Sequence, residues 1–267
     1  MTIPSPADCG RQPPRRTTLK RIASASLVLF GLGCAAAFAE PGTDPVGVVE
    51  LFTSQGCSSC PPADSVFSEL AEKENVVALA YHVDYWDYLG WRDTLGNPDN
   101  TARQYDYMKA FKARAVYTPQ AVINGRKHVN GASRQEIDKA IGDLSRQNGG
   151  LSVDVKATRQ GSNLMIVADA ASGGPREAEV VLVYFEPPTP IQIEHGENTG
   201  KTVTYWNAVS GLQVAGMWHG RPASFELPMR EVEKKGAGGC AVLLQSVNAD
   251  GSPGAILGAT VLHEPRI

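Results

Sequence analysis

The chain has 267 residues, of which 42% are hydrophobic, 20% charged and 7% aromatic. This composition is globular and excludes a globally disordered or low-complexity chain. The formal net charge is −3, but residues 1–39 carry five basic residues and one acidic residue, which leaves 20 basic against 27 acidic residues in the remainder. A remainder that acidic, without a run of Lys or Arg, is a poor binder of nucleic acids and anionic membranes. We therefore expect no nucleic-acid partner.

The first 39 residues have the organisation of an export signal. A basic segment from Arg15 to Arg21 precedes an apolar stretch over residues 22–38, and Ala37 and Ala39 are the small residues that a signal peptidase requires. The stretch is marginal for a membrane span of about 20 residues. We predict a cleaved signal peptide over residues 1–39, a periplasmic or secreted protein and no integral membrane span after cleavage. A retained anchor is the alternative, and the route of export (general or twin-arginine) stays open.

Cysteine usage gives the sharpest functional signal. Cys9 and Cys34 belong to the signal segment, which leaves Cys57, Cys60 and Cys240. Cys240 lies in an apolar run typical of a buried strand, and we interpret it as a small buried side chain. Cys57-Ser-Ser-Cys60 is a C-x-x-C pair, whose loop is too short to hold a fold together.

The C-x-x-C pair lies between a predicted strand and a predicted helix. Residues 46–52 form a β-branched run typical of a buried parallel strand. Residues 61–73 have apolar residues at helical spacing after two prolines, which a first helical turn tolerates. We expect Cys57 at or just before the N-terminus of the helix and Cys60 one turn inside it. The helix dipole and unpaired N–H groups stabilise a thiolate there, so that Cys57 exchanges and Cys60 resolves the mixed disulfide.

The predicted elements up to residue 149 follow the order β-α-β-α-β-β-α of a thioredoxin fold. After the first strand and helix, the patterns predict a strand over residues 75–83, a helix over 101–112, a strand up to 123, a return strand from 126 and a helix after the capping box Ser133–Glu136. In thioredoxin-like proteins a cis-proline precedes the third core strand and packs against the C-x-x-C pair. Pro119 is the candidate, and Thr118 before it would offer its backbone to the substrate.

From residue 151 the pattern becomes all-β, with short strands separated by turns rich in Gly and Pro. The strands are expected at residues 151–157, 164–168, 178–185, 201–208, 212–218, 223–227, 239–247 and 255–262. The predicted fold class is an α/β thioredoxin-like domain over residues 40–149, followed by an all-β sandwich-like domain over residues 150–267. The alternative is one composite domain. The polar segment Gly196–Gly200 is a candidate border of a binding face.

Acidic and aromatic residues follow the second predicted strand, where ligands often bind in open α/β sheets. Asp84 and Trp86 are candidates for substrate binding beside Cys57, and an acid in this position could move the proton of the resolving thiol. The competing interpretation is that the aromatic residues bury an insertion and that the acids cap helices.

Three segments resemble a known family. Val49–Asp64, His82–Trp91 and Val116–Gln120 are similar to the bacterial secreted thioredoxin-like family catalogued as a domain of unknown function, DUF1223. The resemblance covers the chain from about Pro45 onward. It implies a thioredoxin-like fold and export, but no established substrate.

Together these patterns predict an exported thiol–disulfide oxidoreductase. Cys57, Cys60 and Pro119 are the predicted catalytic residues, the redox-active disulfide requires no bound cofactor, and exported proteins or small thiols are the expected substrates. Two alternatives stay open. One is a periplasmic chaperone for copper or another metal, with Cys57, Cys60 and His82 as ligands. The other is a non-enzymatic binding module whose disulfide is inert.

Overall fold

Strand β1 (Gly47–Thr53) is the centre of the first sheet, and all seven of its residues are buried. It pairs in parallel with β2 (Val76–His82) and antiparallel with β3 (Gln120–Ile123), which pairs with β4 (Lys127–Asn130). The sheet order is thus β2-β1-β3-β4. The structure is a computed structural model that describes residues 44–73 and 75–263. The predicted signal peptide, with Cys9 and Cys34, lies outside the described residues.

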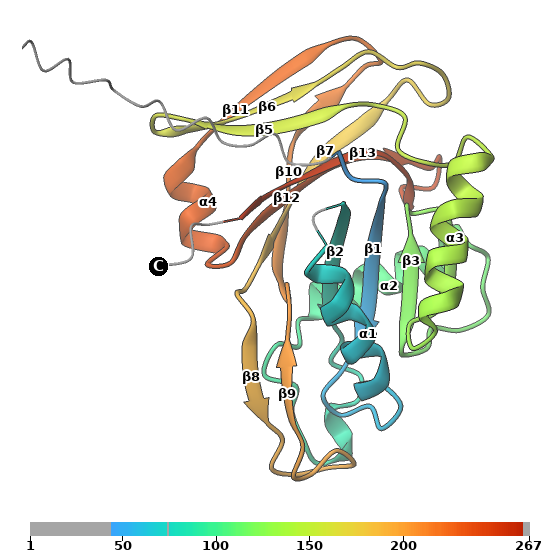
Figure 1. Cartoon of the computed structure of the whole chain (residues 1–267), viewed down its shortest axis with the longest axis vertical. Coiled ribbons are helices and arrows are strands. Elements are labelled where there is room, and N and C mark those ends of the chain that lie inside the picture. The colour runs from blue at the N-terminus through green and yellow to red at the C-terminus, as the bar shows by residue number, and fades with distance from the viewer. Residues whose placement is uncertain (1–43, 74, 264–267) are drawn as a thin grey trace, which may run out of the picture. The chain divides into compact units, whose positions relative to one another are not determined.

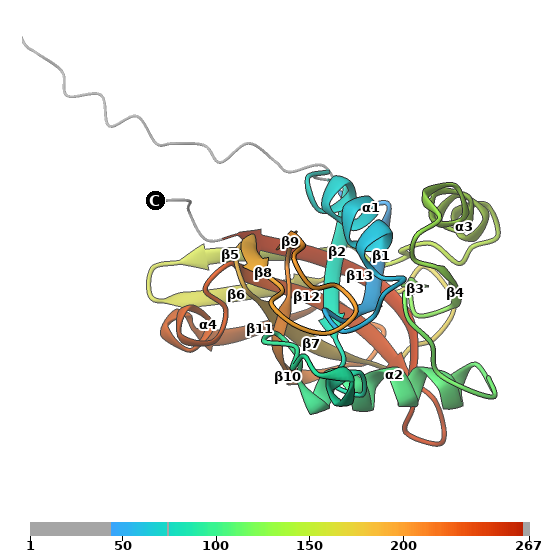
Figure 2. The ribbon, with the colours of Figure 1, turned by 90° about the horizontal axis from the view of Figure 1, so that it is seen from below.

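Three helices flank this sheet. Helices α1 (Pro61–Ala71) and α3 (Arg134–Arg146) bury their apolar sides on one face of it, and α2 (Pro98–Ala110) lies on the opposite side (Figure 2). Ser133 caps α3 as predicted, because its hydroxyl accepts a hydrogen bond from the backbone N–H of Glu136 at 3.3 Å. The second bond of the capping box does not form, because the backbone N–H of Ser133 donates to the Asn130 carbonyl instead. Helix α2 begins earlier than predicted, because the side chain of Asn97 caps it and Pro98 occupies its first turn.

The second half of the chain forms three further sheets. The largest has the order β10-β7-β12-β13, the next β11-β6-β5, and the last is the hairpin β8-β9. The patterns did not predict β8 or the short helix α4. The bounds are β5 (Val155–Gln160), β6 (Asn163–Ala168), β7 (Ala178–Phe185), β8 (Thr189–Gln192), β9 (Thr202–Tyr205), β10 (Val209–Trp218), β11 (Ala223–Pro228), α4 (Met229–Lys235), β12 (Gly239–Val247) and β13 (Pro253–His263), with a 3₁₀ turn η1 (Asp87–Leu89) after β2.

The sheets are stacked in layers, as Figure 1 shows. One apolar core lies between the β1 sheet and the β7 sheet, and it combines residues such as Phe52 and Leu79 with Val183 and Leu243. A second core lies between the β7 sheet and the β5-β6-β11 sheet, and it includes the buried Cys240. A third lies under α1 and α3. The edge strand β2 is covered as well, because Asn207 and Ala208 pair with it at Ala80.

The expected fold class is wrong. The described residues form 13 strands in four sheets and only four α-helices, so the fold is mostly β rather than an α/β thioredoxin-like domain followed by a β-sandwich. The physical reason is that much of the second face of the β1 sheet is covered by strands β7, β12 and β13. Local patterns placed most individual strands and helices, but they do not state which faces pack together. The predicted limits at residues 39 and 149 stay a prediction.

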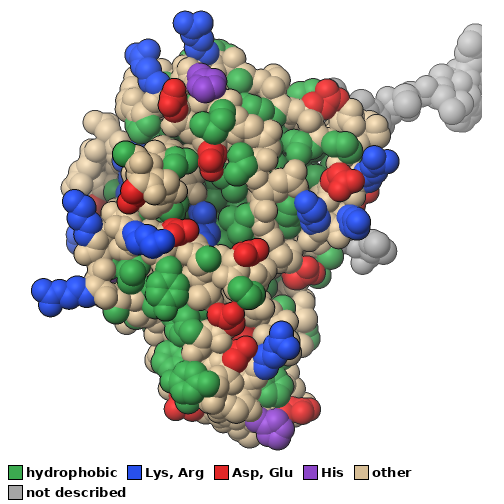
Figure 3. Space-filling model, turned by 180° about the vertical axis from the view of Figure 1, so that it is seen from behind, with side chains coloured by type: hydrophobic (Ala, Val, Ile, Leu, Met, Phe, Trp, Pro, Cys, Tyr) green, Lys and Arg blue, Asp and Glu red, His purple; other side chains and the backbone are tan. Residues whose placement is uncertain are grey.

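Two further observations concern membrane spans and the surface. In the described part of the chain, no helix is long and apolar enough to span a membrane. The face shown in Figure 3 intersperses acidic, basic and hydrophobic side chains.

A buried polar cluster around an ion pair joins the two halves of the chain. The carboxylate of Glu50 in β1 is fully buried and accepts hydrogen bonds from Arg103 at 2.8 Å and from the hydroxyl of Tyr107. Arg103 also donates to Gln245 Oε1 on β12 at 2.8 Å, and Gln245 Nε2 donates to the Tyr107 hydroxyl at 2.9 Å. Each polar group compensates for the desolvation of another, so removing one leaves a buried charge without its partner.

We predict that Arg103→Ala lowers the free energy of unfolding by about 3–5 kcal/mol, because it leaves the buried Glu50 carboxylate without its counter-charge. Urea unfolding measures the change. Lys109→Ala is the control, since Lys109 pairs with Asp106 on the same helix at the surface and surface pairs contribute about 0–1 kcal/mol. Equal unfolding midpoints for the two variants would contradict the prediction.

Candidate functional site

Cys57 and Cys60 form a disulfide in the loop between β1 and α1, with their Cα atoms 5.4 Å apart. Cys60 is the residue that caps the N-terminus of α1, so it precedes the helix instead of lying one turn inside it. Both cysteines are buried, with 2% of Cys57 and none of Cys60 exposed, whereas Ser58 and Ser59 between them are exposed. Little of either cysteine is therefore accessible to a thiol in solution.

The helix N-terminus offers fewer hydrogen-bond donors than the sequence suggested. Pro61 and Pro62 occupy its first two positions and have no backbone N–H. The next two N–H groups, of Ala63 and Asp64, both donate to the carbonyl of Cys60 at 2.8 and 3.0 Å. Donors for a thiolate on Cys57 must therefore come from other groups.

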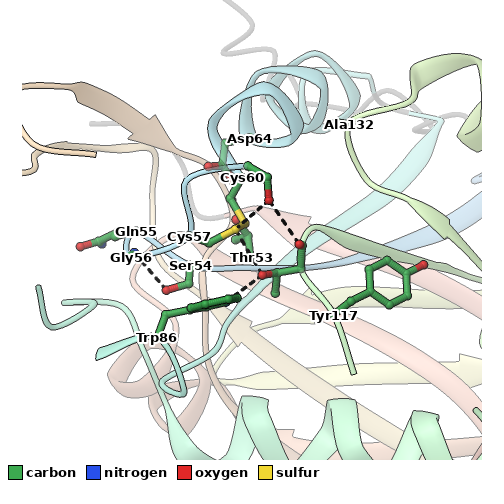
Figure 4. The surroundings of a disulfide bond; sticks show 12 residues. Thr53, Ser54, Gln55, Gly56, Cys57, Cys60, Asp64, Trp86, Tyr117 and Ala132 are labelled. Atoms are coloured by element: carbon green, nitrogen blue, oxygen red, sulfur yellow. Dashed lines mark hydrogen bonds between the residues drawn. A yellow bond between two sulfur atoms is a disulfide. The ribbon is translucent and has the colours of Figure 1, made fainter. Parts of the chain in front are cut away.

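Side-chain hydroxyls supply those donors. The Thr118 hydroxyl donates to Cys57 Sγ at 3.2 Å and accepts from the indole N–H of Trp86 at 2.9 Å. Because an indole N–H can only donate, Trp86 orients the Thr118 hydroxyl so that its own proton is available for the sulfur. The Ser59 hydroxyl lies 3.4 Å from the same sulfur. Dashed lines in Figure 4 mark the hydrogen bonds that lead from Trp86 to the disulfide.

The structure brings four of the predicted site residues together, namely Cys57, Cys60, Trp86 and Thr118. The Thr118–Pro119 peptide bond is cis, and Pro119 is buried. The side chains of the other two candidates, Asp84 and His82, form hydrogen bonds with residues outside this group. The carboxylate of Asp84 accepts from the hydroxyl of Thr101 on α2 at 2.7 Å, whereas Asn97 is the residue that caps this helix.

His82 belongs to a buried cluster of ionisable residues. Its Nδ1 lies 2.8 Å from Asp93 Oδ2, and both side chains are fully buried. Burial by itself would lower the pKa of His82, but the Asp93 carboxylate raises it above its usual value. Burial opposes ionisation of Asp93 too, yet His82 and the backbone N–H of Gln55 hold its pKa below the usual range. Among the described residues, no group of three or more His, Cys, Asp or Glu is arranged to hold a metal ion.

Asp64 is a buried acid that the sequence patterns did not single out. It follows Cys60 by four residues on α1, a spacing that places two residues on the same helix side. Its Oδ1 accepts from the Thr53 hydroxyl at 2.7 Å, and its Oδ2 is buried without a hydrogen-bond partner. Burial raises the pKa of Asp64 from 3.8 to about 7, against the opposing effects of Thr53 and His82. Figure 4 shows Asp64 beside Cys60.

The comparison with protein families settles the relationship of the chain. The family model described as "Protein of unknown function (DUF1223)" matches residues 48–245. The chain belongs to this family. The resemblance drawn from the sequence motifs is thereby confirmed, and the match includes the C-x-x-C loop, Trp86 and Thr118.

Two solved structures are similar to this DUF1223 protein. Protein AGR_C_4864 from Agrobacterium tumefaciens is 45% identical, with a TM-score of 0.76, over 84% of this chain and 97% of that one. HBP35 of Porphyromonas gingivalis is 12% identical, with a TM-score of 0.55, over 82% of this chain and 75% of that one. At that identity the second likeness concerns the fold alone. No curated protein matches the chain.

We predict that Asp64→Asn stabilises the protein more at pH 8 than at pH 5. The unfolded chain releases this proton near pH 4, whereas the folded protein keeps it until about pH 7. The unfolded state therefore binds fewer protons between these values, so the contribution of Asp64 to stability falls as the pH rises. Asparagine does not titrate and escapes this loss.

Urea unfolding of both proteins at pH 5 and pH 8 measures the difference. The control is Asp138→Asn, which makes the same change at a half-exposed acid on α3 and against which the pH dependence of Asp64→Asn is compared. A pH-independent difference for Asp64→Asn would contradict the assignment.

Proposed function

We propose that this DUF1223 protein is a thiol–disulfide oxidoreductase whose reactive group is the Cys57–Cys60 disulfide. The observation that carries the proposal is the hydrogen bond from the Thr118 hydroxyl to Cys57 Sγ. A structural disulfide needs no donor on its sulfur. A cysteine that becomes a thiolate does, because hydrogen bonds to the charged form lower the thiol pKa and provide more of the reactive species.

The reaction is an exchange in two steps. A substrate thiolate attacks Cys57 Sγ, which forms a mixed disulfide and breaks the Cys57–Cys60 bond, and the electron pair leaves on Cys60 as a thiolate that takes up a proton. A second substrate thiolate then attacks the substrate sulfur and releases Cys57 as a thiolate. The substrate dithiol is oxidised to a disulfide and the protein pair is reduced. The reverse sequence reduces a substrate, and the relative reduction potentials set the direction.

The surrounding residues have separate roles in this exchange. Thr118, oriented by Trp86, stabilises the thiolate on Cys57. Asp64 lies one helical turn from Cys60 and titrates near neutrality, which suits an acid that gives a proton to Cys60 and takes it back. The predicted export signal places the reaction in the periplasm or outside the cell, where disulfides persist. Exported proteins or small thiols are the corresponding substrates.

We predict that the Cys60→Ser variant accumulates a mixed disulfide when it is incubated with a peptide that contains a disulfide. Cys57 can attack this peptide, but no second thiol remains to release it. Mass spectrometry under non-reducing conditions measures the adduct. Cys57→Ser is the matched control. The thiol that it keeps belongs to Cys60, which has no exposed surface, so we expect little attack on the peptide. Absence of the adduct from Cys60→Ser, or an equal yield from both variants, would rule out the proposed exchange.

We predict that Thr118→Val, made in the Cys60→Ser background, raises the pKa of the Cys57 thiol. Valine has nearly the shape of threonine but cannot donate to the sulfur, so the thiolate loses a stabilising hydrogen bond. The pH dependence of iodoacetamide alkylation measures the shift. Tyr117→Phe removes the neighbouring hydroxyl, which bonds His128 and Val129 instead, and should leave the pH profile unchanged. If Thr118→Val leaves the pH dependence of alkylation unchanged, the main support for the proposal is lost.

A further inference from the structure

The loop between β8 and β9 reaches the disulfide from the other half of the chain. Asn198 in this loop is 1% exposed, and its Nδ2 donates to the backbone carbonyls of Gln55 at 2.9 Å and Cys57 at 2.8 Å. Its Oδ1 accepts from Lys201 Nζ at 2.8 Å. Because an ammonium group can only donate and a carbonyl can only accept, this network admits one orientation of the amide. The polar segment Gly196–Gly200 thus borders the disulfide itself.

These two hydrogen bonds fix the backbone on both sides of Cys57. Each peptide group is a rigid plane, so holding the Gln55 carbonyl fixes the peptide that enters Gly56. Holding the Cys57 carbonyl fixes the peptide that leaves toward Ser58. Gly56 itself packs closely against the residue before η1, because an added Cβ would lie 3.1 Å from Trp86 Cβ. The segment is therefore held between Trp86 and the β8–β9 loop.

The loop is supported from its other side as well. At Gly196 the backbone φ is +77° and an added Cβ would lie 3.1 Å from Trp91 Cβ, so the loop is in close contact with the residues after β2. The Trp91 indole N–H donates to Gln55 Oε1 at 2.8 Å. Gln55 thus connects Trp91 through its side chain to Asn198 through its backbone. Opening the segment requires several buried polar contacts to break together.

We propose that Asn198 is a positioning residue that limits the access of thiols to Cys57, so that the β8–β9 loop gates the disulfide. An attacking thiolate must reach a sulfur that belongs to a residue only 2% exposed, and exchange rates depend on this access. The two hydrogen bonds from Asn198 oppose the backbone movement that would expose Cys57. This inference rests on the proposed exchange function and adds the element that controls it.

The test measures the rate at which dithiothreitol reduces the Cys57–Cys60 disulfide under native conditions, with the thiols labelled by a maleimide and counted by mass spectrometry. Asn198→Ala removes both hydrogen bonds and should accelerate reduction more than tenfold. Asn198→Asp keeps the size of the side chain and its partner Lys201, but places a carboxylate against two carbonyl oxygens. It should accelerate reduction to a similar degree, and it provides the measurement if the alanine variant does not fold.

Asn207→Ala is the matched control. Its amide is also buried and also joins the two halves of the chain, through a hydrogen bond to the carbonyl of Ala78 at 3.0 Å, but it does not touch the disulfide segment. This variant should be reduced within twofold of the unmodified rate. A general loss of stability would accelerate the control and the Asn198 variants alike.

The outcomes separate the gate from the exchange function. Unchanged or slower reduction of the folded Asn198 variants, or equal acceleration of Asn207→Ala, would overturn the gate and leave the proposed exchange intact. A gate is supported when only the Asn198 variants accelerate. Failure of Cys60→Ser to form any adduct with a peptide disulfide would instead refute the exchange function.

Discussion

The burial of strand β1 along its whole length is the constraint on which the rest of the structure depends. A strand covered on both faces can carry a charge only if that charge is paired, and Glu50 is paired by Arg103 and Tyr107 inside the core. Gln245 extends the same cluster to β12, so the ionic group also fixes how the two sheets pack. The apolar cores around it are extensive, but they are less specific about register than a hydrogen-bonded charge.

The same burial decides the character of the disulfide loop that follows β1. A loop that passes through the interior must satisfy its carbonyl and N–H groups without water. Asn198 donates to the carbonyls of Gln55 and Cys57, and Asp93 accepts from the backbone N–H of Gln55, so these partners come from two different stretches of the chain. The Cys57 sulfur therefore accepts a hydrogen bond from Thr118 but has little exposed surface. In the exchange that we propose, the bond from Thr118 favours reactivity, whereas enclosure by the β8–β9 loop restrains it.

Beneath the disulfide, ionisable groups are arranged in two different ways. His82 and Asp93 are paired, so each favours the charged form of the other. Asp64 has a hydroxyl partner on one oxygen and none on the other, so burial keeps its proton in place up to about pH 7. In the exchange that we propose, Asp64 can take part in proton transfer beside Cys60, whereas the paired His82 and Asp93 serve chiefly to hold the structure.

The sequence by itself determined the features that depend on neighbouring residues. Hydrophobic periodicity located β1 and α1, the capping box located α3, the C-x-x-C spacing located the disulfide, and the motifs around Cys57, His82 and Pro119 identified the family. Only the tertiary structure decided which sheet faces pack together, and it replaced the expected α/β class by a mostly β fold. Only the tertiary structure, too, showed that Asp84 bonds to Thr101 on α2 and that Asn198, 141 residues from Cys57, holds its carbonyl. The reason is physical, because propensities and caps act within a few residues, whereas burial and the pairing of buried polar groups are set by segments that meet only after folding.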